Sequence, residues 1–394
     1  MIKKYILFAF IFIAAIAYAQ YGSLSETSKV SILSLGPGGN LNDSFGHCAF
    51  RINDKENNID IVYDYGRYDF NTPNFYLKFA RGKLLYELGT NNYLPFFDYY
   101  KRQNRWVKEQ ILDLNYSEKQ ALFNFLQNNS KPENKKYRYD FFYDNCATKI
   151  PDVLEAVVGD KLVFKEGHIT EDYSFRELIQ KNVNANSWGS LGMDVAIGAV
   201  VDRKPRLVDY QFLPEYILKG ADNAIVKRNN DEVPLVKRTV SLFEAAEEKH
   251  ESNFFTSPLF IFSCIGLLIL LITYKDFKNS TRTRTLDTVI FFITGIIGVM
   301  ILFLWFGTDH STTANNYNLL WSSPLSLLFF ISIFQKQPKV WLRKYVFFLL
   351  LCFALLSIHW ITGVQVFAIG LIPLFIALII RYLYLMKYLK NTSV

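Results

Sequence analysis

The chain has little of the chemistry that holds metals. It contains only four cysteines and five histidines in 394 residues, and no Cys or His cluster has the short spacing of a zinc site. The sequence therefore predicts neither a structural metal nor a bound cofactor. Cys264 and Cys352 lie inside apolar runs and are expected to be small hydrophobic side chains, which leaves Cys48 and Cys146 for chemistry.

The chain also lacks a basic stripe, although its formal net charge is +7. Lys and Arg alternate with Asp and Glu in the first 250 residues, and in the last third they gather between apolar runs. A nucleic-acid-binding surface needs basic residues clustered on one face. We therefore expect no nucleic-acid partner, and membrane topology explains the C-terminal basic residues.

The N-terminus has the layout of a secretory leader. Residues 1–19 begin with Lys3 and Lys4, continue with an apolar stretch, and end in Ala17-Tyr18-Ala19 before Gln20. This pattern predicts a signal peptide cleaved after Ala19, with an uncleaved anchor helix as the alternative. Either form exports the residues that follow.

Five later apolar runs each approach the ~20 residues that a membrane span needs. They are residues 258–274, 288–306, 317–334, 345–364 and 366–385. Basic residues follow the first, third and fifth runs, whereas the loop 307–316 has no Lys or Arg. The positive-inside rule then places the C-terminus in the cytoplasm. We expect a signal peptide (1–19), an extracytoplasmic domain (20–255) and a transmembrane domain (256–394), in a multi-pass protein of the inner membrane.

Cys146 and His47 are the candidate reactive residues. Cys146 follows Asp144 and Asn145, which are good helix caps, so it is expected in the first turn of a helix, where the dipole favours the thiolate. His47 follows Gly46 at the start of a predicted strand. A Cys at a helix N-terminus that faces a His on a strand is typical of papain-like thiol catalysis. A buried, inert Cys146 and a disulfide between Cys48 and Cys146 are the alternatives.

Several long motifs resemble a known family. They are L-G-P-G at 35–38, F-G-H-C-A-F-R-I at 45–52, the run from Val62 to Lys83, and Y-R-Y-D-F-F-Y-D-N-C-A-T-K-I at 137–150. Asp309-His310, Asn315 and N-L-L-W at 318–321 resemble the family's membrane part. The family is that of domain of unknown function 4105, the Lnb-type lipoprotein N-acyltransferases. The order of His and Cys is also similar to permuted NlpC/P60-like proteins.

This resemblance implies an α+β fold: a permuted papain-like (NlpC/P60-like) domain followed by an all-α bundle of about five transmembrane helices. It implies Cys146 as nucleophile, His47 as base and Asp64 as the third member. A simple hairpin register, however, turns Tyr63 or Tyr65 to the side of His47 instead of Asp64. Asn145, His310 and Asn315 are the expected substrate-binding residues.

The implied reaction is acyl transfer through a thioester on Cys146. The acyl donor would be a membrane phospholipid, and the acceptor would be the α-amine of the lipidated N-terminal Cys of diacylglyceryl lipoproteins. A thiol peptidase or amidase that acts on cell-wall peptides is the alternative, although five spans exceed what a wall hydrolase needs. A membrane module without catalytic activity is the third possibility.

Overall fold

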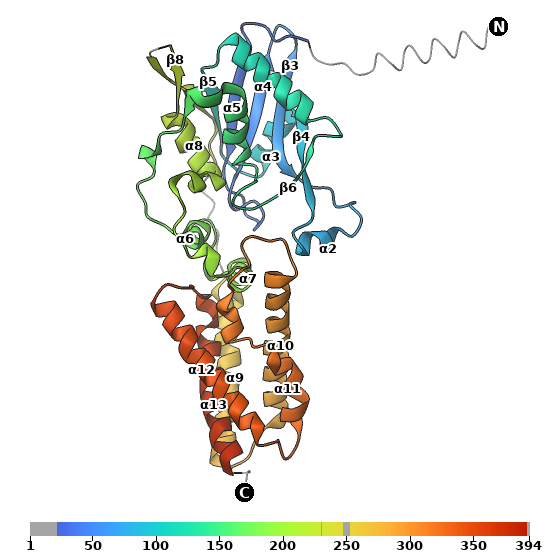
Figure 1. Cartoon of the computed structure of the whole chain (residues 1–394), viewed down its shortest axis with the longest axis vertical. Coiled ribbons are helices and arrows are strands. Elements are labelled where there is room, and N and C mark those ends of the chain that lie inside the picture. The colour runs from blue at the N-terminus through green and yellow to red at the C-terminus, as the bar shows by residue number, and fades with distance from the viewer. Residues whose placement is uncertain (1–21, 230, 247–252, 392–394) are drawn as a thin grey trace, which may run out of the picture.

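The computed structural model describes residues 22–229, 231–246 and 253–391, so the expected signal peptide lies outside the described residues. Two parts follow one another along the chain (Figure 1). We call residues 22–246 the N-terminal domain and residues 253–391 the membrane domain. The mixed α and β structure of the first and the helices of the second confirm the expected fold class.

A seven-stranded antiparallel sheet forms the centre of the N-terminal domain, in the order β10-β5-β1-β2-β3-β4-β6. The strands are β1 (Lys29–Leu35), β2 (His47–Asp54), β3 (Ile59–Arg67), β4 (Leu85–Asn92), β5 (Val107–Leu112), β6 (Lys136–Arg138) and β10 (Val236–Phe243). A second sheet of three short strands contains β7 (Leu162–Val163), β8 (Ile225–Arg228) and β9 (Asp231–Pro234).

Helices cover both faces of the large sheet, which explains why its central strands carry apolar side chains on both sides. One face packs against α4 (Tyr116–Asn129), α5 (Lys149–Val158) and α8 (Pro214–Asn223), with Phe50 and Phe123 fully buried between them. The other face packs against α3 (Tyr93–Arg102), where Leu33 and Leu35 are fully buried. His47 and Asp64 belong to the α3 face.

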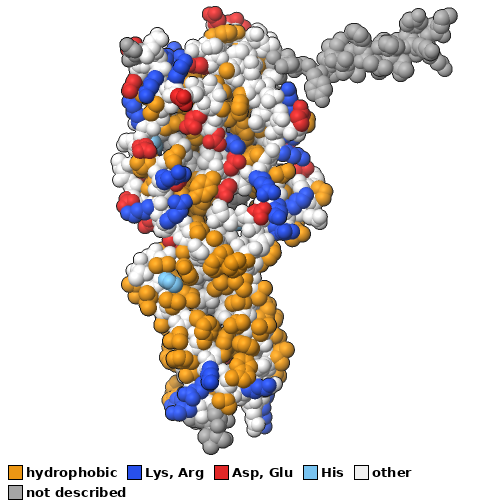
Figure 2. All heavy atoms as spheres, in the orientation of Figure 1, with side chains coloured by type: hydrophobic (Ala, Val, Ile, Leu, Met, Phe, Trp, Pro, Cys, Tyr) orange, Lys and Arg blue, Asp and Glu red, His pale blue; other side chains and the backbone are white. Residues whose placement is uncertain are grey.

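Five helical segments of the membrane domain are long and apolar enough to cross a bilayer, and they match the five predicted spans. They are α9 (Pro258–Lys278), α10 (Arg284–Phe306), η6 (Tyr317–Leu320) with α11 (Leu325–Phe334), α12 (Trp341–Ile361), and η7 (Ile369–Leu371) with α13 (Ile372–Asn391). Apolar side chains cover this part, with Lys and Arg at its far end (Figure 2).

A charged cluster is buried inside the bundle. The side chain of Arg381 is fully buried and bonds to Asp276 and Asp287, both at 2.7 Å. Arg282 lies 3.6 Å from Asp287. Two Arg and two Asp side chains compensate one another, which is how a bilayer tolerates such groups.

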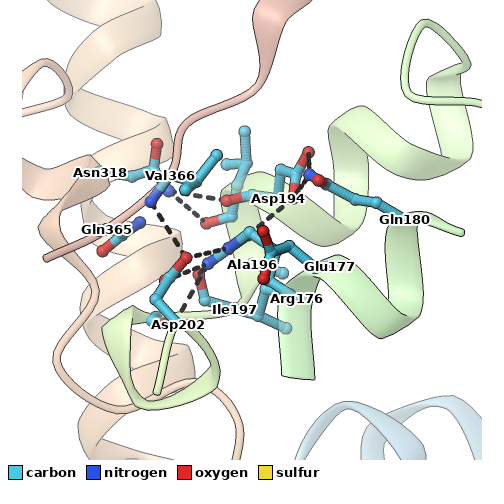
Figure 3. Close-up of polar contacts among 12 residues, drawn as sticks. Arg176, Glu177, Gln180, Asp194, Ala196, Ile197, Asp202, Asn318, Gln365 and Val366 are labelled. Carbon is cyan, nitrogen blue, oxygen red and sulfur yellow. Dashed lines mark hydrogen bonds and ion pairs between the residues drawn. The ribbon is translucent and has the colours of Figure 1, made fainter. Parts of the chain in front are cut away.

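Helices α6 (Phe175–Gln180) and α7 (Trp188–Ala196) join the N-terminal domain to the membrane domain (Figure 1). Arg176 is buried and bonds to Asp194 at 2.6 Å and Asp202 at 2.8 Å. The Asp202 carboxylate also accepts a hydrogen bond from the backbone N–H of Val366, which lies in the loop between α12 and α13 (Figure 3). Asn318 of the membrane domain donates to the Asp194 carbonyl at 2.9 Å. We call this contact the junction.

Candidate functional site

His47 and Asp64 lie on the same face of the sheet because of the register between β2 and β3. The pairs Phe50 with Tyr63 and Asp54 with Ile59 leave a four-residue turn between the strands. With this register His47 Nε2 lies 3.4 Å from Asp64 Oδ2. The simple register that would turn Tyr63 or Tyr65 toward His47 is therefore wrong.

Asp64 is held in place from its other side. Its two carboxylate oxygens accept hydrogen bonds from Arg67 Nε at 3.0 Å and Arg67 Nη2 at 2.5 Å. Burial raises the pKa of this carboxyl, but the contacts with His47 and Arg67 outweigh burial and lower the pKa below its ordinary value. Asp64 is thus a buried, ionised group that faces the imidazole.

Cys146 lies in the turn that leads into α5. The helix begins at Lys149, so the expectation that Cys146 lies in its first turn was wrong by about one turn. The turn is organised by Asn145, whose Oδ1 accepts from the backbone N–H groups of Ala147 at 2.7 Å and Thr148 at 2.9 Å. Asn145 still caps the chain before a helix.

The Cys146 thiol meets His47 at the end of the sheet. The two side chains share a hydrogen bond, and the backbone N–H of Cys48 donates to the Cys146 sulfur. Gly66 of β3 lies beside Cys146, since a Cβ there would be in ordinary contact with the Cys146 Cβ at 3.4 Å, and its φ is +96°. Only glycine adopts that backbone conformation without strain.

The pair changes the ionisation of both groups. Burial alone would lower the pKa of His47, but Tyr100, Cys146 and Asp64 outweigh it and raise that pKa well above its ordinary value. Burial alone would raise the pKa of Cys146, but the charge and hydrogen bond of His47 outweigh it and lower that pKa. The arrangement favours a thiolate beside an imidazolium, the reactive form of a thiol site.

The two cysteines of the N-terminal domain are free and differ in environment. Cys48 is fully buried in the core on the opposite face of the sheet from His47, and burial raises its pKa well above the ordinary value. Cys146 is partly exposed and opens onto a cavity. The geometry therefore separates a structural cysteine from an accessible one.

A cavity of about 820 Å³ extends from Cys146 and His47 toward the membrane domain. Aromatic residues form a large part of its walls, which is typical of sites for apolar ligands. The aromatic wall residues are Phe45, Tyr68, Phe70, Phe75, Tyr76, Phe79, Tyr86, Tyr99, Tyr100, Tyr139, Phe141 and Phe212. The loop after α10 also contributes Asp309, His310, Ser311 and Thr312. The cavity thus lies between the two domains.

The three expected substrate-binding residues have different positions. His310 lines the cavity, and its Nε2 lies 3.1 Å from the Phe79 carbonyl. Asn145 also lines the cavity, but its amide is fully engaged, since Nδ2 donates to the carbonyls of Phe141 and Phe212. Asn315 lies outside the cavity lining and accepts from the Ala199 N–H at the junction. Of the three, His310 alone has a position suited to ligand contact.

Sequence reasoning missed two residues that contact the cluster of Cys146, His47 and Asp64. Tyr100 of α3 stacks on the His47 ring, with centroids 6.3 Å apart and planes 14° apart. Arg67 forms an ion pair with Asp64 and follows it by three residues in the run from Val62 to Lys83. Its position in that motif was the available signal.

Within the part of the chain that the structure describes, no group of three or more His, Cys, Asp or Glu side chains could hold a metal ion.

Fold and site together define a multi-pass membrane protein with a Cys–His–Asp cluster in a domain outside the bilayer. The chain belongs to the Lnb family of lipoprotein-modifying proteins. Residues 18–180 match the Lnb N-terminal periplasmic domain, and residues 249–392 match the Lnb transmembrane domain. The N-terminal domain is therefore periplasmic. No curated protein and no solved structure matches the chain.

Proposed function

We propose that the chain is a lipoprotein N-acyltransferase with Cys146 as nucleophile, His47 as acid and base, and Asp64 as the group that orients His47. The observation that carries the proposal is the position of this cluster at the end of an aromatic cavity that the membrane domain helps to close. We also propose the permuted NlpC/P60-like relationship, removal of residues 1–19, and the division at residue 255.

The first half-reaction forms a thioester. The Cys146 thiolate attacks the carbonyl carbon of a phospholipid ester, and the bond between that carbon and the glycerol oxygen then breaks. The imidazolium of His47 gives its proton to the departing oxygen, so that a neutral lysophospholipid hydroxyl leaves. The backbone N–H of Cys48 stabilises the sulfur before the attack.

The second half-reaction forms the amide. The α-amine of the lipidated N-terminal Cys of a diacylglyceryl lipoprotein attacks the thioester carbonyl and loses a proton to His47. The carbon–sulfur bond breaks, and Cys146 returns as a thiolate. Asp64 stabilises the imidazolium in both halves, because its carboxylate stays ionised beside the ring.

The experiment is mass spectrometry of the N-terminal peptide of one lipoprotein. With this protein present, we expect the peptide to carry one fatty acyl amide, and with the Cys146→Ala protein we expect a free amine. An amide at an unchanged level in cells that lack this protein would refute the proposal. Cleavage of a muropeptide by the purified protein would support the peptidase or amidase alternative instead.

A further inference from the structure

The short helix α2 (Phe75–Ala80) and the loop before it expose an unusual set of apolar side chains. Phe70 is 66% exposed, Tyr76 79%, Leu77 55% and Phe79 51%. Phe75 connects them, since its ring lies 4.8 Å from that of Phe70 and 6.3 Å from that of Phe79. We call Phe70, Tyr76, Leu77 and Phe79 the α2 patch. Contiguous exposed apolar side chains of this kind mark an interaction surface.

The α2 patch lies at the boundary of the bilayer. The carbonyl of Arg81, just after α2, accepts a hydrogen bond from the Asp309 N–H at 2.9 Å. Asp309 is three residues beyond the end of α10 at Phe306, where the span leaves the hydrocarbon. Figure 1 shows α2 beside this loop, at the lower edge of the N-terminal domain. An apolar surface beside the end of a membrane span is placed to meet lipid.

Basic side chains accompany the α2 patch. Lys83 and Arg138 share Asp309, at 3.9 Å and 3.3 Å. Lys78 and Arg81 form no ion pair with any other residue that the structure describes. Apolar side chains with adjacent Lys and Arg are typical of segments that lie in the headgroup region, where the cations meet lipid phosphates.

The α2 patch is also a wall of the cavity. Phe70, Tyr76 and Phe79 line the cavity and are each more than half exposed, so they belong both to the cavity wall and to the exposed apolar surface. A continuous series of aromatic contacts then leads inward. Tyr68 contacts Phe75 and Tyr86, and Tyr86 stacks on Tyr139 with centroids 4.3 Å apart. Tyr139 lies in the same loop as Cys146.

We propose that the α2 patch dips into the outer leaflet and is the gate through which the acyl chain of a membrane phospholipid reaches Cys146. The chemical step at Cys146 rests on the proposed function, but the position of the α2 patch in the leaflet does not. The gate needs no large movement of the domains, because the same few side chains of α2 and the loop before it belong to the α2 patch and to the cavity wall.

The first test measures the position of the α2 patch without catalysis. The full-length Cys146→Ala protein is placed in vesicles of phosphatidylethanolamine and phosphatidylglycerol, with photoreactive p-benzoylphenylalanine in place of Tyr76. The matched control carries it in place of Tyr116, which is 41% exposed and begins α4, a helix on the side of the domain away from the membrane domain (Figure 1). We expect a phospholipid adduct at position 76 and none at 116, by mass spectrometry.

Absence of a phospholipid adduct at position 76 would overturn the proposal. An adduct that forms only with an added diacylglyceryl lipoprotein would also overturn it, because the occupant of the gate would then be the acceptor.

The second test measures passage through the gate. Leu77→Glu changes the side chain that belongs to the α2 patch without lining the cavity, so the site itself stays intact. We expect the acylation of Cys146 by phospholipid in vesicles to slow by about tenfold or more. Alkylation of Cys146 by iodoacetamide should stay unchanged, and Tyr116→Glu should change neither rate.

The outcomes separate the gate from the chemistry. Equal acylation rates in the wild type and in the Leu77→Glu protein would overturn the gate and leave the acyltransferase intact. A wild type that gives the adduct at position 76 but never an acylated Cys146 would refute the proposed function, while the position of the α2 patch in the leaflet would stand.

Discussion

At the scale of single residues, the two cysteines of the N-terminal domain differ in every property that governs reactivity. Cys146 shares a hydrogen bond with His47 and opens onto the cavity, whereas Cys48 is fully buried on the other face of the sheet. The part of Cys48 that contacts Cys146 is its backbone N–H, which an alanine at this position would also have. Although Cys48 is next to His47 in the sequence, its side chain points to the opposite face of the strand, so it does not belong to the site.

We predict that Cys146→Ala abolishes the hydroxylamine-sensitive acyl adduct, while Cys48→Ala retains it. The measurement is mass spectrometry of the peptide that contains Cys146 after incubation with labelled phospholipid. Cys48→Ala should lower the free energy of unfolding only slightly, because it leaves a small cavity in the core. Equal loss of the adduct in both variants would contradict the assignment of Cys146 as nucleophile.

The pH dependence of Cys146 alkylation follows from the shifts at the pair. Because His47 lowers the pKa of Cys146, alkylation by iodoacetamide should become fast at a pH below the ordinary thiol value of about 8.5. In His47→Gln, the N–H of Cys48 still lowers this pKa, but burial and the charge of Asp64 both raise it, so the midpoint should move upward. An unchanged midpoint in His47→Gln would contradict the ion pair.

At the scale of structural elements, the junction fixes the height of the site above the membrane. Arg176 is 1% exposed and bonds to both Asp194 and Asp202, and the Asp202 carboxylate also accepts the Val366 N–H of the membrane domain. Removing one partner of such a cluster typically costs about 3–5 kcal/mol. The junction therefore resists separation of the domains, and it holds the cavity floor under Cys146.

We predict that Gly198→Ala weakens the junction. A Cβ at Gly198 would lie 1.9 Å from the carbonyl oxygen of Ala314, and a backbone atom cannot move aside as a flexible side chain can. Gly192→Ala in α7 is the matched control, because nothing lies within 4 Å of a Cβ there. We expect a lower thermal midpoint and slower acylation for Gly198→Ala, and no loss for Gly192→Ala.

The sequence predicted elements better than their contacts. Hydropathy located all five spans, because the apolar composition of a span is a property of one continuous stretch of sequence. The start of α5 was misplaced, since the Asn145 side chain bonds to N–H groups of the turn before the helix. The β2–β3 register that brings Asp64 to the side of His47 depends on the length of the turn between the strands, which periodicity does not encode.

Long-range contacts lay beyond the sequence pattern altogether. Asp202 accepts hydrogen bonds from both Arg176 and Val366, which lie 190 positions apart in the chain. The cavity likewise combines α2 with the loop after α10. Local propensity and periodicity report on neighbours within a few residues, so such sites become visible only when the chain is folded.

At the scale of the whole molecule, the orientation in the membrane is testable by labelling. In a protein without Cys146 and Cys264, we predict that a membrane-impermeant maleimide labels Thr362→Cys in intact cells with a permeabilised outer membrane, but not Asn279→Cys. Thr362 follows α12 on the periplasmic side, and Asn279 follows α9 on the cytoplasmic side. Both should react after lysis. The reverse pattern would contradict the loop-charge argument.

A site fixed at the bilayer surface should also use lipid only from its own membrane. The N-terminal domain is joined to the spans by the junction, and the cavity is closed from below by the loop after α10, so Cys146 cannot reach a distant bilayer. We predict that vesicles containing the protein transfer a labelled acyl chain to Cys146 when the label lies in the same vesicle. Label supplied in protein-free vesicles should give no adduct over the same time. Restricting the label to the leaflet that faces the N-terminal domain should preserve the rate, and restricting it to the opposite leaflet should abolish it. Equal transfer from separate vesicles would mean that free lipid in solution is the donor, which the closed geometry of the cavity does not favour.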